Sequence, residues 1–246
     1  MIFRPYYYYE TGCAAYLLGC GSLGKCAVVD SHLEDVDAYL EFAASKGMTI
    51  THVIDTHLHA DHLTGGPALA ARAGALYCMH ESAALDFDFA RLRDGQEIGL
   101  GNTRVHVLHT PGHTPESVCL LVSDLRRSSA PWFALTGDTL FVGAVGRPDL
   151  PGKAHEGAAE LYDSIHSKLL TLPDDLEIYP AHFAGSMCGA GMSGKPSSTL
   201  AFEKRWNDLL SKDRDSFIAA LTDVPPKPAA MDAILRKNRR GPERAL

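Results

Sequence analysis

The chain has 246 residues, 46% of them hydrophobic and 22% charged, which is an ordinary composition for a globular protein with a sizeable core. Its net charge of −7 and pI of about 5.9 argue against nucleic acid as the main partner, because phosphate binding requires a basic face. Since no apolar stretch approaches the roughly 18 residues of a membrane span, we also expect no membrane partner.

The N-terminal residues and the cysteines bear on where the protein works. The segment MIFRPYYYYETG shows no basic part followed by an apolar part, so we expect no secretory signal and a cytoplasmic location. Six cysteines occur and none forms a C-x-x-C pair. Most of them are therefore expected to be small buried residues and not disulfide partners.

The first half of the chain is predicted to contain both strands and helices. In chain order, the pattern predicts a strand at 2–9, two strands around a glycine-rich turn in 11–30, a helix at 33–47, a strand at 48–55, a helix at 65–75 and a strand at 76–79. The helix at 33–47 is expected to end at Gly47, because glycine is a favoured C-terminal cap.

The second half continues with a run of strands. In chain order, the pattern predicts strands at 103–109, 117–123 and 131–136, a helix at 155–172, a strand at 176–180, a glycine- and serine-rich loop at 183–198, and helices at 200–210, 214–221 and 229–238. Strands that come in runs, with helices between and after them, indicate layered α and β structure with mixed sheets.

The segment THLHADH, residues 56–62, places three histidines and an aspartate within six positions. His57 and His59 are two residues apart, so in an extended segment their side chains point the same way, and Asp61 continues that alternation. His62 departs from it, which suits a second ligand direction. This spacing is typical of a metal-binding segment.

Three further donors follow apolar, strand-like segments. His113 comes after VHVLHTPG, Asp138 after WFALTG and His182 after LEIYPA. Loops at the ends of strands in one layer can meet at one rim, so all seven donors can converge. The alternative is a set of separately hydrogen-bonded polar residues, but the spacing and order favour a metal site. The remaining histidines are interpreted as ordinary polar residues: 32, 52, 80, 106, 109, 155 and 166.

These motifs resemble the metallo-β-lactamase superfamily, in order and spacing, over residues 1 to about 185. The resemblance implies an α/β protein with an αββα sandwich, mixed sheets and a metal site at one edge. We expect residues 1–199 to form this domain and residues 200–246 to form a short helical extension that packs on it. In the family pattern, one metal site corresponds to His57, His59 and His113, the other to Asp61, His62 and His182, and Asp138 bridges them.

Two branches of the superfamily keep all seven donors, so the donors alone leave both open. One branch contains the dinuclear zinc thioesterases like glyoxalase II, and the other the mononuclear iron persulfide dioxygenases. Three features favour the dioxygenases: the segment VGRPD at 145–149, the short tail after His182, and residues 181–207, which resemble dioxygenases fused to rhodanese domains. A separate sulfurtransferase is a candidate partner, and a homodimer is another because the family commonly forms dimers.

The dioxygenase resemblance implies one Fe(II) per chain, bound by His57, His113 and Asp138, with positions left open for a persulfide and O2. The substrate would be glutathione persulfide or a similar thiol persulfide, which O2 oxidises to the thiol and sulfite. The other four donors would orient the ligands and contact the substrate or oxygen, and Asp61 is the candidate catalytic residue among them: His59, Asp61, His62 and His182.

The thioesterase resemblance implies two Zn(II) ions per chain, with all seven donors as ligands. A bridging hydroxide would then attack an acyl carbonyl, as in hydroxyacylglutathione hydrolysis. Binding affinity does not identify the native metal, because the affinities of such a site for different divalent ions follow the same general order whichever ion is native.

Two further residues are candidates for the reaction. The dioxygenase resemblance implies that Arg147 binds the glutathione carboxylate through a bidentate pair, with a local Arg–Asp pair in a turn as the alternative. The segment continues with Leu150 and Pro151 where the family usually has F-Q, and a family tyrosine after the last histidine is missing, so other thiols stay open. Cys188 lies six residues after His182 and could carry or relay a persulfide, with an incidental loop cysteine as the alternative.

Overall fold

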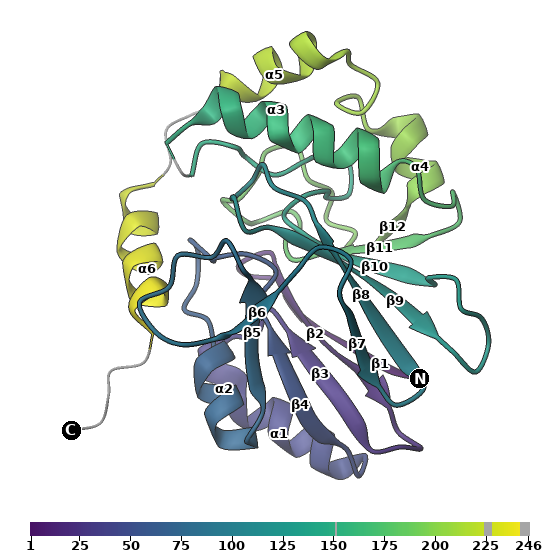
Figure 1. Cartoon of the computed structure of the whole chain (residues 1–246). Helices are drawn as coiled ribbons and strands as arrows, with labels where there is room; N and C mark the ends of the chain where they lie inside the picture. Colours follow the sequence, from purple (N-terminus) through teal and green to yellow (C-terminus); the bar gives the residue numbers. More distant parts are fainter. Residues whose placement is uncertain (151, 224–227, 242–246) are drawn as a thin grey trace.

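Two six-stranded sheets form the centre of the computed structural model, which describes residues 1–150, 152–223 and 228–241 (Figure 1). Pro151 and the final residues of the expected extension, 242–246, lie outside the described residues. The first sheet has the order β1-β2-β3-β4-β5-β6. Its strands are β1 (Ile2–Tyr8), β2 (Cys13–Cys20), β3 (Lys25–Val29), β4 (Thr49–Ile54), β5 (Leu76–His80) and β6 (Ala90–Leu92).

The second sheet has the order β12-β11-β10-β9-β8-β7. Its strands are β7 (Glu97–Leu100), β8 (Thr103–His109), β9 (Val118–Asp124), β10 (Phe133–Gly137), β11 (Glu177–Pro180) and β12 (Ser198–Thr199). Both sheets are mixed: β3 to β6 pair in parallel while β1 to β3 are antiparallel, and in the second sheet β10 and β11 pair in parallel. The predicted mixed sheets are therefore present.

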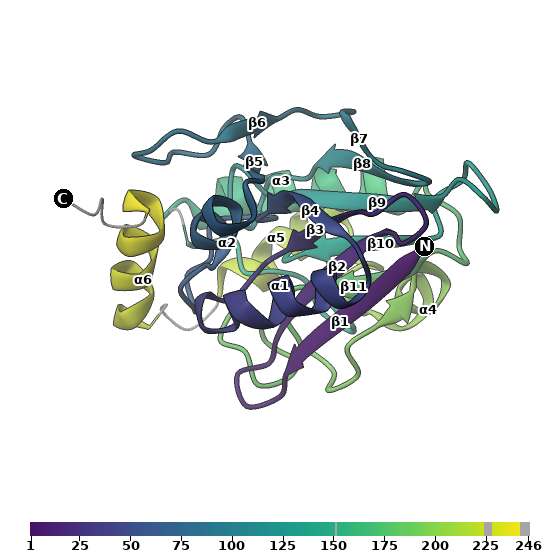
Figure 2. The same ribbon diagram turned by 90° about the horizontal axis from the view of Figure 1, so that it is seen from below.

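Helices cover the outer faces of both sheets. They are η1 (Leu33–Asp35), α1 (Val36–Ser45), α2 (Gly66–Ala73), α3 (Ala154–Ser164), the π-helical η2 (Ile165–Leu169), α4 (Leu200–Trp206), α5 (Arg214–Thr222) and α6 (Ala229–Arg240). α1 and α2 lie on the first sheet and α3 and α5 on the second, so the layers follow the order α, β, β, α (Figures 1 and 2). Every helix in the described ranges is too short or too polar to span a bilayer.

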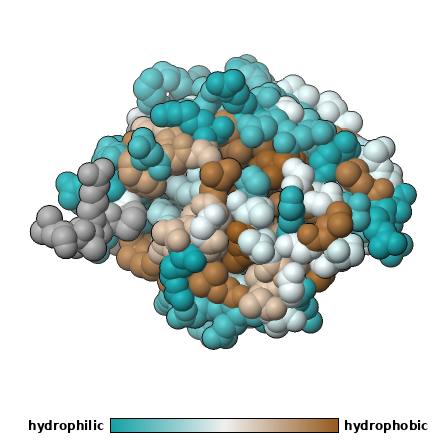
Figure 3. All heavy atoms as spheres, turned by 60° about the horizontal axis from the view of Figure 1, so that its bottom comes forward, coloured by the Kyte–Doolittle hydropathy of each residue, from teal (hydrophilic) through white to brown (hydrophobic). Residues whose placement is uncertain are grey.

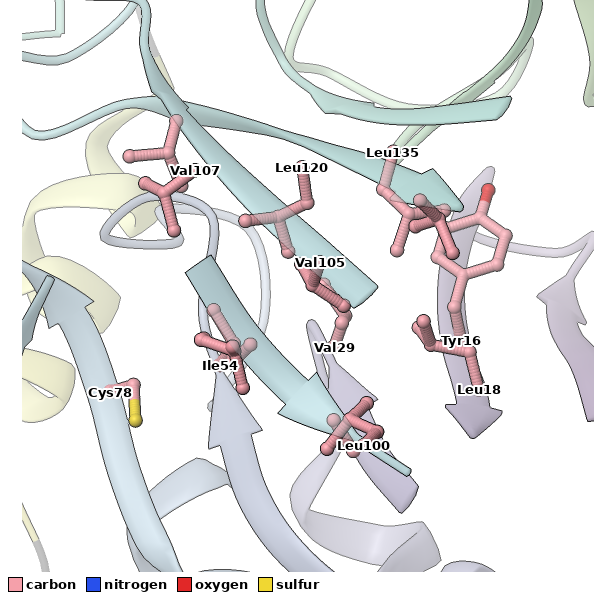
Figure 4. Packing of buried hydrophobic residues seen from close by; sticks show 14 of the residues in the cluster. Tyr16, Leu18, Val29, Ile54, Cys78, Leu100, Val105, Val107, Leu120 and Leu135 are labelled. Atoms are coloured by element: carbon pink, nitrogen blue, oxygen red, sulfur yellow. The ribbon is translucent and has the colours of Figure 1, made fainter. Parts of the chain in front are cut away.

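Strand alternation explains why the two sheets stack. In β2, Tyr16 and Leu18 point toward the second sheet, while Ala15 and Leu17, which alternate with them, point toward the helices. The inward-facing residues of both sheets form one apolar core, in which Leu120 of β9 lies opposite strands of the first sheet (Figure 4). Burial of this apolar surface is the main driving force that holds the two sheets together.

The secondary structure differs from the sequence expectations in short elements. The strands β6, β7 and β12 were not predicted, because segments of two to four residues carry no clear alternation. The helix predicted at 200–210 ends at Trp206. Asn207 leaves the helical conformation, and its Nδ2 donates to the main-chain oxygen of Ala144 at 3.2 Å, which ties the helix end to a neighbouring loop.

The C-terminal helices pack on both sides of the sandwich. α5 contacts α3 through a shared apolar cluster that includes Phe217 and Leu161. α6 stands apart from the other two helices of this region, beside the first sheet, where Met231 and Leu235 pack (Figure 1). The division at residue 199 stays a prediction. All six cysteines are buried and have free thiols, which was expected for most of them, and Cys188 is buried as well.

Candidate metal centre

Loops from both sheets meet at one edge of the sandwich. β4 of the first sheet leads into residues 56–62, and β8, β10 and β11 of the second sheet lead to His113, Asp138 and His182. A hydrogen bond of 2.9 Å from the Val118 N–H to the Thr56 oxygen joins the two sheets at this point. The fold therefore brings together all seven side chains that the sequence singled out.

Three of these donors form a compact buried group, which we call the first group: His57, His113 and Asp138. The Asp138 Oδ2 atom lies 3.6 Å from His57 Nε2 and 3.3 Å from His113 Nε2. Ligand atoms held about 2.1 Å from one ion lie roughly 3.0 to 3.5 Å from each other. The spacing of the first group thus fits a shared metal ion.

The first group also has the hydrogen bonding of a metal site. The His113 Nδ1–H donates to the Arg147 oxygen at 2.8 Å, and His57 Nδ1 lies 3.0 Å from the hydroxyl of Thr56, which itself donates to Asp30. The Nε2 atoms of both histidines and Asp138 Oδ2 are buried and have no hydrogen-bond partner among the described residues. Buried polar atoms without partners are costly, so this arrangement indicates that a ligand satisfies them.

His59 also has one ring nitrogen that makes a hydrogen bond and one that makes none within the described residues, but here Nε2 makes the hydrogen bond. Its Nε2–H donates to Asp30 Oδ1 at 3.2 Å, and its buried Nδ1 lacks a partner within the described residues. Asp30 directly follows β3, has a positive φ of 53° and also accepts the Thr56 N–H at 2.7 Å. The sequence reasoning missed Asp30, although an aspartate directly after an apolar strand was a signal.

The remaining donors form a second group, and a cysteine joins them: Cys13, Asp61, His62 and His182, whose ligand atoms lie within 4.8 Å of one another. His182 Nε2 lies 2.9 Å from Asp61 Oδ2, and the Cys13 thiol lies 3.2 Å from the same oxygen. His182 Nδ1 lies 2.6 Å from Asp138 Oδ1, which connects the two groups. Cys13 was expected to be only a small buried residue.

A stack of aromatic rings supports the second group. The His32 ring lies parallel to the His62 ring with centroids 3.8 Å apart, and the Tyr8 ring stacks on the other side of His32 at 4.0 Å. His32 was interpreted as an ordinary polar residue, and the structure instead places it against a donor. Its ring fixes the orientation of His62.

The electrostatics of the centre favour a cation. Burial lowers the pKa of His57 and His59 well below the usual histidine value, so both are neutral and can donate a lone pair. Burial alone would raise the pKa of Asp138, but His182, His57 and His113 outweigh it and hold this pKa below its ordinary value. The carboxylate of Asp138 therefore stays charged although it is buried, and it can bind a cation.

Two hydrogen-bonding side chains outside the donor set hold the histidine loop. Asn238 of α6 donates through Nδ2 to the main-chain oxygens of His59 and His62, both at 2.9 Å, and accepts the Thr64 N–H at 3.1 Å. Glu116 accepts the Leu58 N–H at 2.9 Å. Both residues are buried, and they fix the backbone from which the donors project.

Arg147 forms the local ion pair that was the alternative to carboxylate binding. Its Nε and Nη2 atoms donate to the two oxygens of Asp149 at 2.6 and 2.8 Å. Its main-chain oxygen is the acceptor for His113. The main chain of segment 145–149 thus contacts the first group through the Arg147 oxygen, and this contact does not depend on what the guanidinium binds.

Cys188 is fully buried next to the centre. Its ligand atom lies within 4.8 Å of those of Asp138 and His182, and its neighbours are Ala60 and Met231. Burial raises the pKa of the Cys188 thiol well above its ordinary value, so the thiol is protonated at neutral pH. A persulfide-carrying role for Cys188 stays a prediction.

The sequence profile described as the metallo-beta-lactamase superfamily matches residues 8–182, and this chain belongs to that superfamily. A crystal structure of a metallo-beta-lactamase from Staphylococcus aureus superimposes with a TM-score of 0.91 at 32% identity, covering 100% of this chain and 74% of that one. The crystal structure of ETHE1 from Myxococcus xanthus gives a TM-score of 0.84 at 34% identity, covering 97% and 98% of the two chains. The predicted αββα sandwich is confirmed.

Relatives of known name fall into both branches considered above. The human persulfide dioxygenase ETHE1, a protein named as mitochondrial, is 29% identical over 228 residues, which cover 92% of this chain and 82% of that protein. A hydroxyacylglutathione hydrolase of Polaromonas is 34% identical over 245 residues, covering 87% of this chain and 89% of that protein. These similarities and the donor set indicate a metal-dependent enzyme. The cytoplasmic location stays a prediction.

Proposed function

We propose that the protein is a mononuclear non-haem iron dioxygenase that oxidises a low-molecular-weight thiol persulfide. The observation that carries the proposal is the buried, unpartnered set of His57 Nε2, His113 Nε2 and Asp138 Oδ2 in the described structure. Two histidines and one carboxylate with open positions are the typical ligands of non-haem iron(II) oxygenases. The similarity to ETHE1 proteins over most of the chain supports the same assignment.

The second group supports one catalytic ion over two. His182 uses both ring nitrogens in hydrogen bonds, Nδ1 to Asp138 and Nε2 to Asp61. A dinuclear zinc hydrolase would need Asp61 and His182 as ligands. The proton in the hydrogen bond between His182 Nε2 and Asp61 would therefore have to leave when the second ion binds. In the first group, each of the three side chains has a ligand atom with no hydrogen-bond partner among the described residues, whereas in the second group His62 Nε2 is in that state while Asp61 and His182 are hydrogen-bonded.

In overall balance, R-S-SH, O2 and one water give R-SH, sulfite and two protons. The bound Fe(II) would supply the redox chemistry between O2 and the terminal sulfur. His57, His113 and Asp138 would hold the ion, and their hydrogen bonds would fix the ring orientations. Asp61 and His182 share a hydrogen bond of 2.9 Å beside this group, where they can hold one proton of the reaction.

The proposal is tested by measuring metal content and oxygen uptake on one preparation, expressed with iron supplied and handled without chelator. We expect about one iron per chain, and O2 consumption with release of sulfite when glutathione persulfide is added. About two zinc ions per chain, no O2 uptake and hydrolysis of an acyl-glutathione thioester would instead establish the hydrolase, to which the Polaromonas relative points.

Arg147 is proposed to contact the carboxylate of the thiol substrate. Replacing it with lysine is expected to raise KM for glutathione persulfide by about tenfold with a small change in kcat, because a bidentate charged hydrogen bond is lost. Steady-state oxygen uptake gives both constants. The Arg147→Lys variant keeps the main-chain oxygen that accepts from His113, so its iron content should not change.

The contrasting result for Arg147 would be an unchanged KM with a lower melting temperature. That outcome would mean that the role of Arg147 is the ion pair with Asp149 and that Arg147 does not bind the substrate. The Asp149→Asn variant is the matched control, because it breaks the same pair and keeps the guanidinium.

Cys188 is proposed to assist turnover from its buried position beside His182. The Cys188→Ser variant is expected to lose activity by roughly tenfold, as substitutions beside a metal site commonly do, with its iron content unchanged. Oxygen uptake and metal analysis on the same sample measure both quantities. Full activity in this variant would reduce Cys188 to a packing residue against Ala60 and Met231.

The partners beyond the substrate stay predictions. The face shown in Figure 3 carries hydrophobic residues toward its middle and hydrophilic ones around them. Large side chains such as Tyr9 and Leu76 are exposed, at 63% and 54%. Single exposed apolar residues are normal on a protein surface, so they neither require nor exclude the expected homodimer.

A further inference from the structure

We propose that a cavity between α2 and α6 binds a small amphipathic anion, a molecule with an apolar body and one anionic head group. The cavity has a volume of about 500 Å³, which lies in the range of small-molecule sites. α6 lies beside α2 in both ribbon views (Figures 1 and 2). The residues around the cavity come from η1, from the segment after His62, from the first turn of α2 and from the end of α6, and they include Leu33, Leu63, Pro67, Ala68, Lys237 and Arg240.

The cavity is separate from the metal centre. Among the described residues that line it, none is one of the seven donors, and none belongs to the segment 145–149. The start of α6 packs beside the centre, where Met231 lies in one apolar cluster with Cys188. The cavity lies at the other end of the helix, near Arg240. The proposal therefore does not depend on which ion or reaction the metal centre serves.

One wall of the cavity is apolar and open to solvent. Leu33 and Leu63 are 46% and 37% exposed, and the Leu33 N–H donates to the Leu63 oxygen at 3.2 Å, which holds the two residues side by side. Pro67 and Ala68 of α2 add further apolar surface. Exposed apolar side chains that gather around one cavity are typical of a ligand site, since water solvates such a surface poorly. This wall favours a ligand with an apolar body.

The wall formed by α6 carries two positive charges. Lys237 and Arg240 are exposed and line the cavity, and neither makes an ion pair with a described residue. Elsewhere on the surface, an exposed cation such as Arg72 is paired, here with Asp37. The described lining residues include no carboxylate. In a chain of net charge −7, two cations without an ion partner beside an apolar cavity favour an anionic head group.

The α6 wall is already fixed without a ligand. Asn238 donates to the main-chain oxygens of His59 and His62, both at 2.9 Å. The Asp86 N–H donates to the Arg239 oxygen at 2.9 Å, which holds the end of the helix from the other side. A site whose walls are formed beforehand loses little freedom on binding, and this favours affinity.

The test is a titration of the full-length protein with anilinonaphthalene sulfonate, a dye with an anionic head that fluoresces in apolar sites. We expect saturable binding of about one dye molecule per chain. Decanoate, below the concentration at which it forms micelles, should displace the dye. Decanol should displace it about tenfold more weakly, because it has no charged head group to accept hydrogen bonds from the cations.

Variants separate the charges from the apolar wall. The double variant Lys237→Gln, Arg240→Gln should bind decanoate about tenfold more weakly and decanol equally well. The matched control is Arg236→Gln, Arg239→Gln, which removes two exposed charges from the same helix outside the lining and should change either affinity by less than about threefold. Ala68→Phe places a ring in the cavity and should weaken both ligands.

Three results would overturn the proposal. The dye could fail to bind with saturation, decanoate and decanol could displace it equally well, or the charge variant and its control could bind decanoate with the same affinity. Dye binding that survives Ala68→Phe would place the dye on another apolar surface and would also overturn the proposal. The melting temperature of each variant shows that it is folded. None of these measurements uses metal content or turnover, so a failure of the dioxygenase assignment and a failure of this site are distinguishable.

Discussion

Replacing Asp138 with asparagine is expected to remove iron from the first group and to abolish persulfide-dependent oxygen uptake. Asp138 contacts three imidazoles: its Oδ2 faces His57 and His113, and its Oδ1 lies 2.6 Å from His182 Nδ1. The amide keeps the shape of the side chain and removes the buried negative charge. Loss of one partner from a buried charged cluster costs about 3 to 5 kcal/mol, which corresponds to more than a hundredfold in metal affinity.

Metal analysis after dialysis, together with oxygen uptake, measures the effect of Asp138→Asn. The informative comparison is Asp61→Asn, which alters only the second group. With a single catalytic iron, Asp61→Asn should keep about one iron per chain. If Asp61→Asn loses metal as completely as Asp138→Asn, the two groups act as one dinuclear site and the mononuclear proposal is wrong.

Replacing Gly146 with alanine is expected to damage both stability and metal binding. A Cβ at position 146 would lie 1.9 Å from the main-chain oxygen of Asp138 and 3.0 Å from His113 Nδ1. Backbone atoms cannot move aside as a flexible side chain can, so Asp138 would have to shift. We expect a loss of about 2 to 3 kcal/mol in the free energy of unfolding, and less iron per chain.

Denaturant unfolding and metal analysis check the Gly146→Ala prediction. Gly99→Ala is the matched control, because a methyl group on the Gly99 Cα would meet no atom within 4 Å, and the φ of Gly99 lies outside the left-handed region. That control should change the free energy of unfolding by less than about 1 kcal/mol. If the two substitutions changed the free energy of unfolding equally, the short distance between position 146 and the Asp138 oxygen would not limit the side chain at position 146.

The donors of the centre could be predicted because each follows a strand. Strand ends in stacked sheets lie at a common edge, so the order of His57, His113, Asp138 and His182 after apolar segments was enough to place them together. The layered architecture followed from the runs of strands in the same way. Both predictions rest on local sequence patterns, so they need no knowledge of how distant segments pair.

The supporting residues could not be predicted by this reasoning. Cys13 reaches the centre only because the β1–β2 hairpin bridges to His182, and His32 only because its ring stacks on His62. Asn238 comes from a helix whose place beside the histidine loop depends on tertiary packing. Such contacts join segments far apart in the chain, and neither spacing nor periodicity reports them.

The contact between Asn238 and the histidine loop has a consequence for biosynthesis. Asn238 lies 176 residues after His62, so the ribosome releases the loop long before the side chain that fixes its backbone. Until then the histidines belong to a nascent chain without the rigid geometry on which metal selection depends. The histidine loop therefore gains these hydrogen bonds only at the last stage of synthesis. A premature stop between residues 182 and 238 would leave a protein with all seven donors but without the hydrogen bonds from Asn238 to the loop.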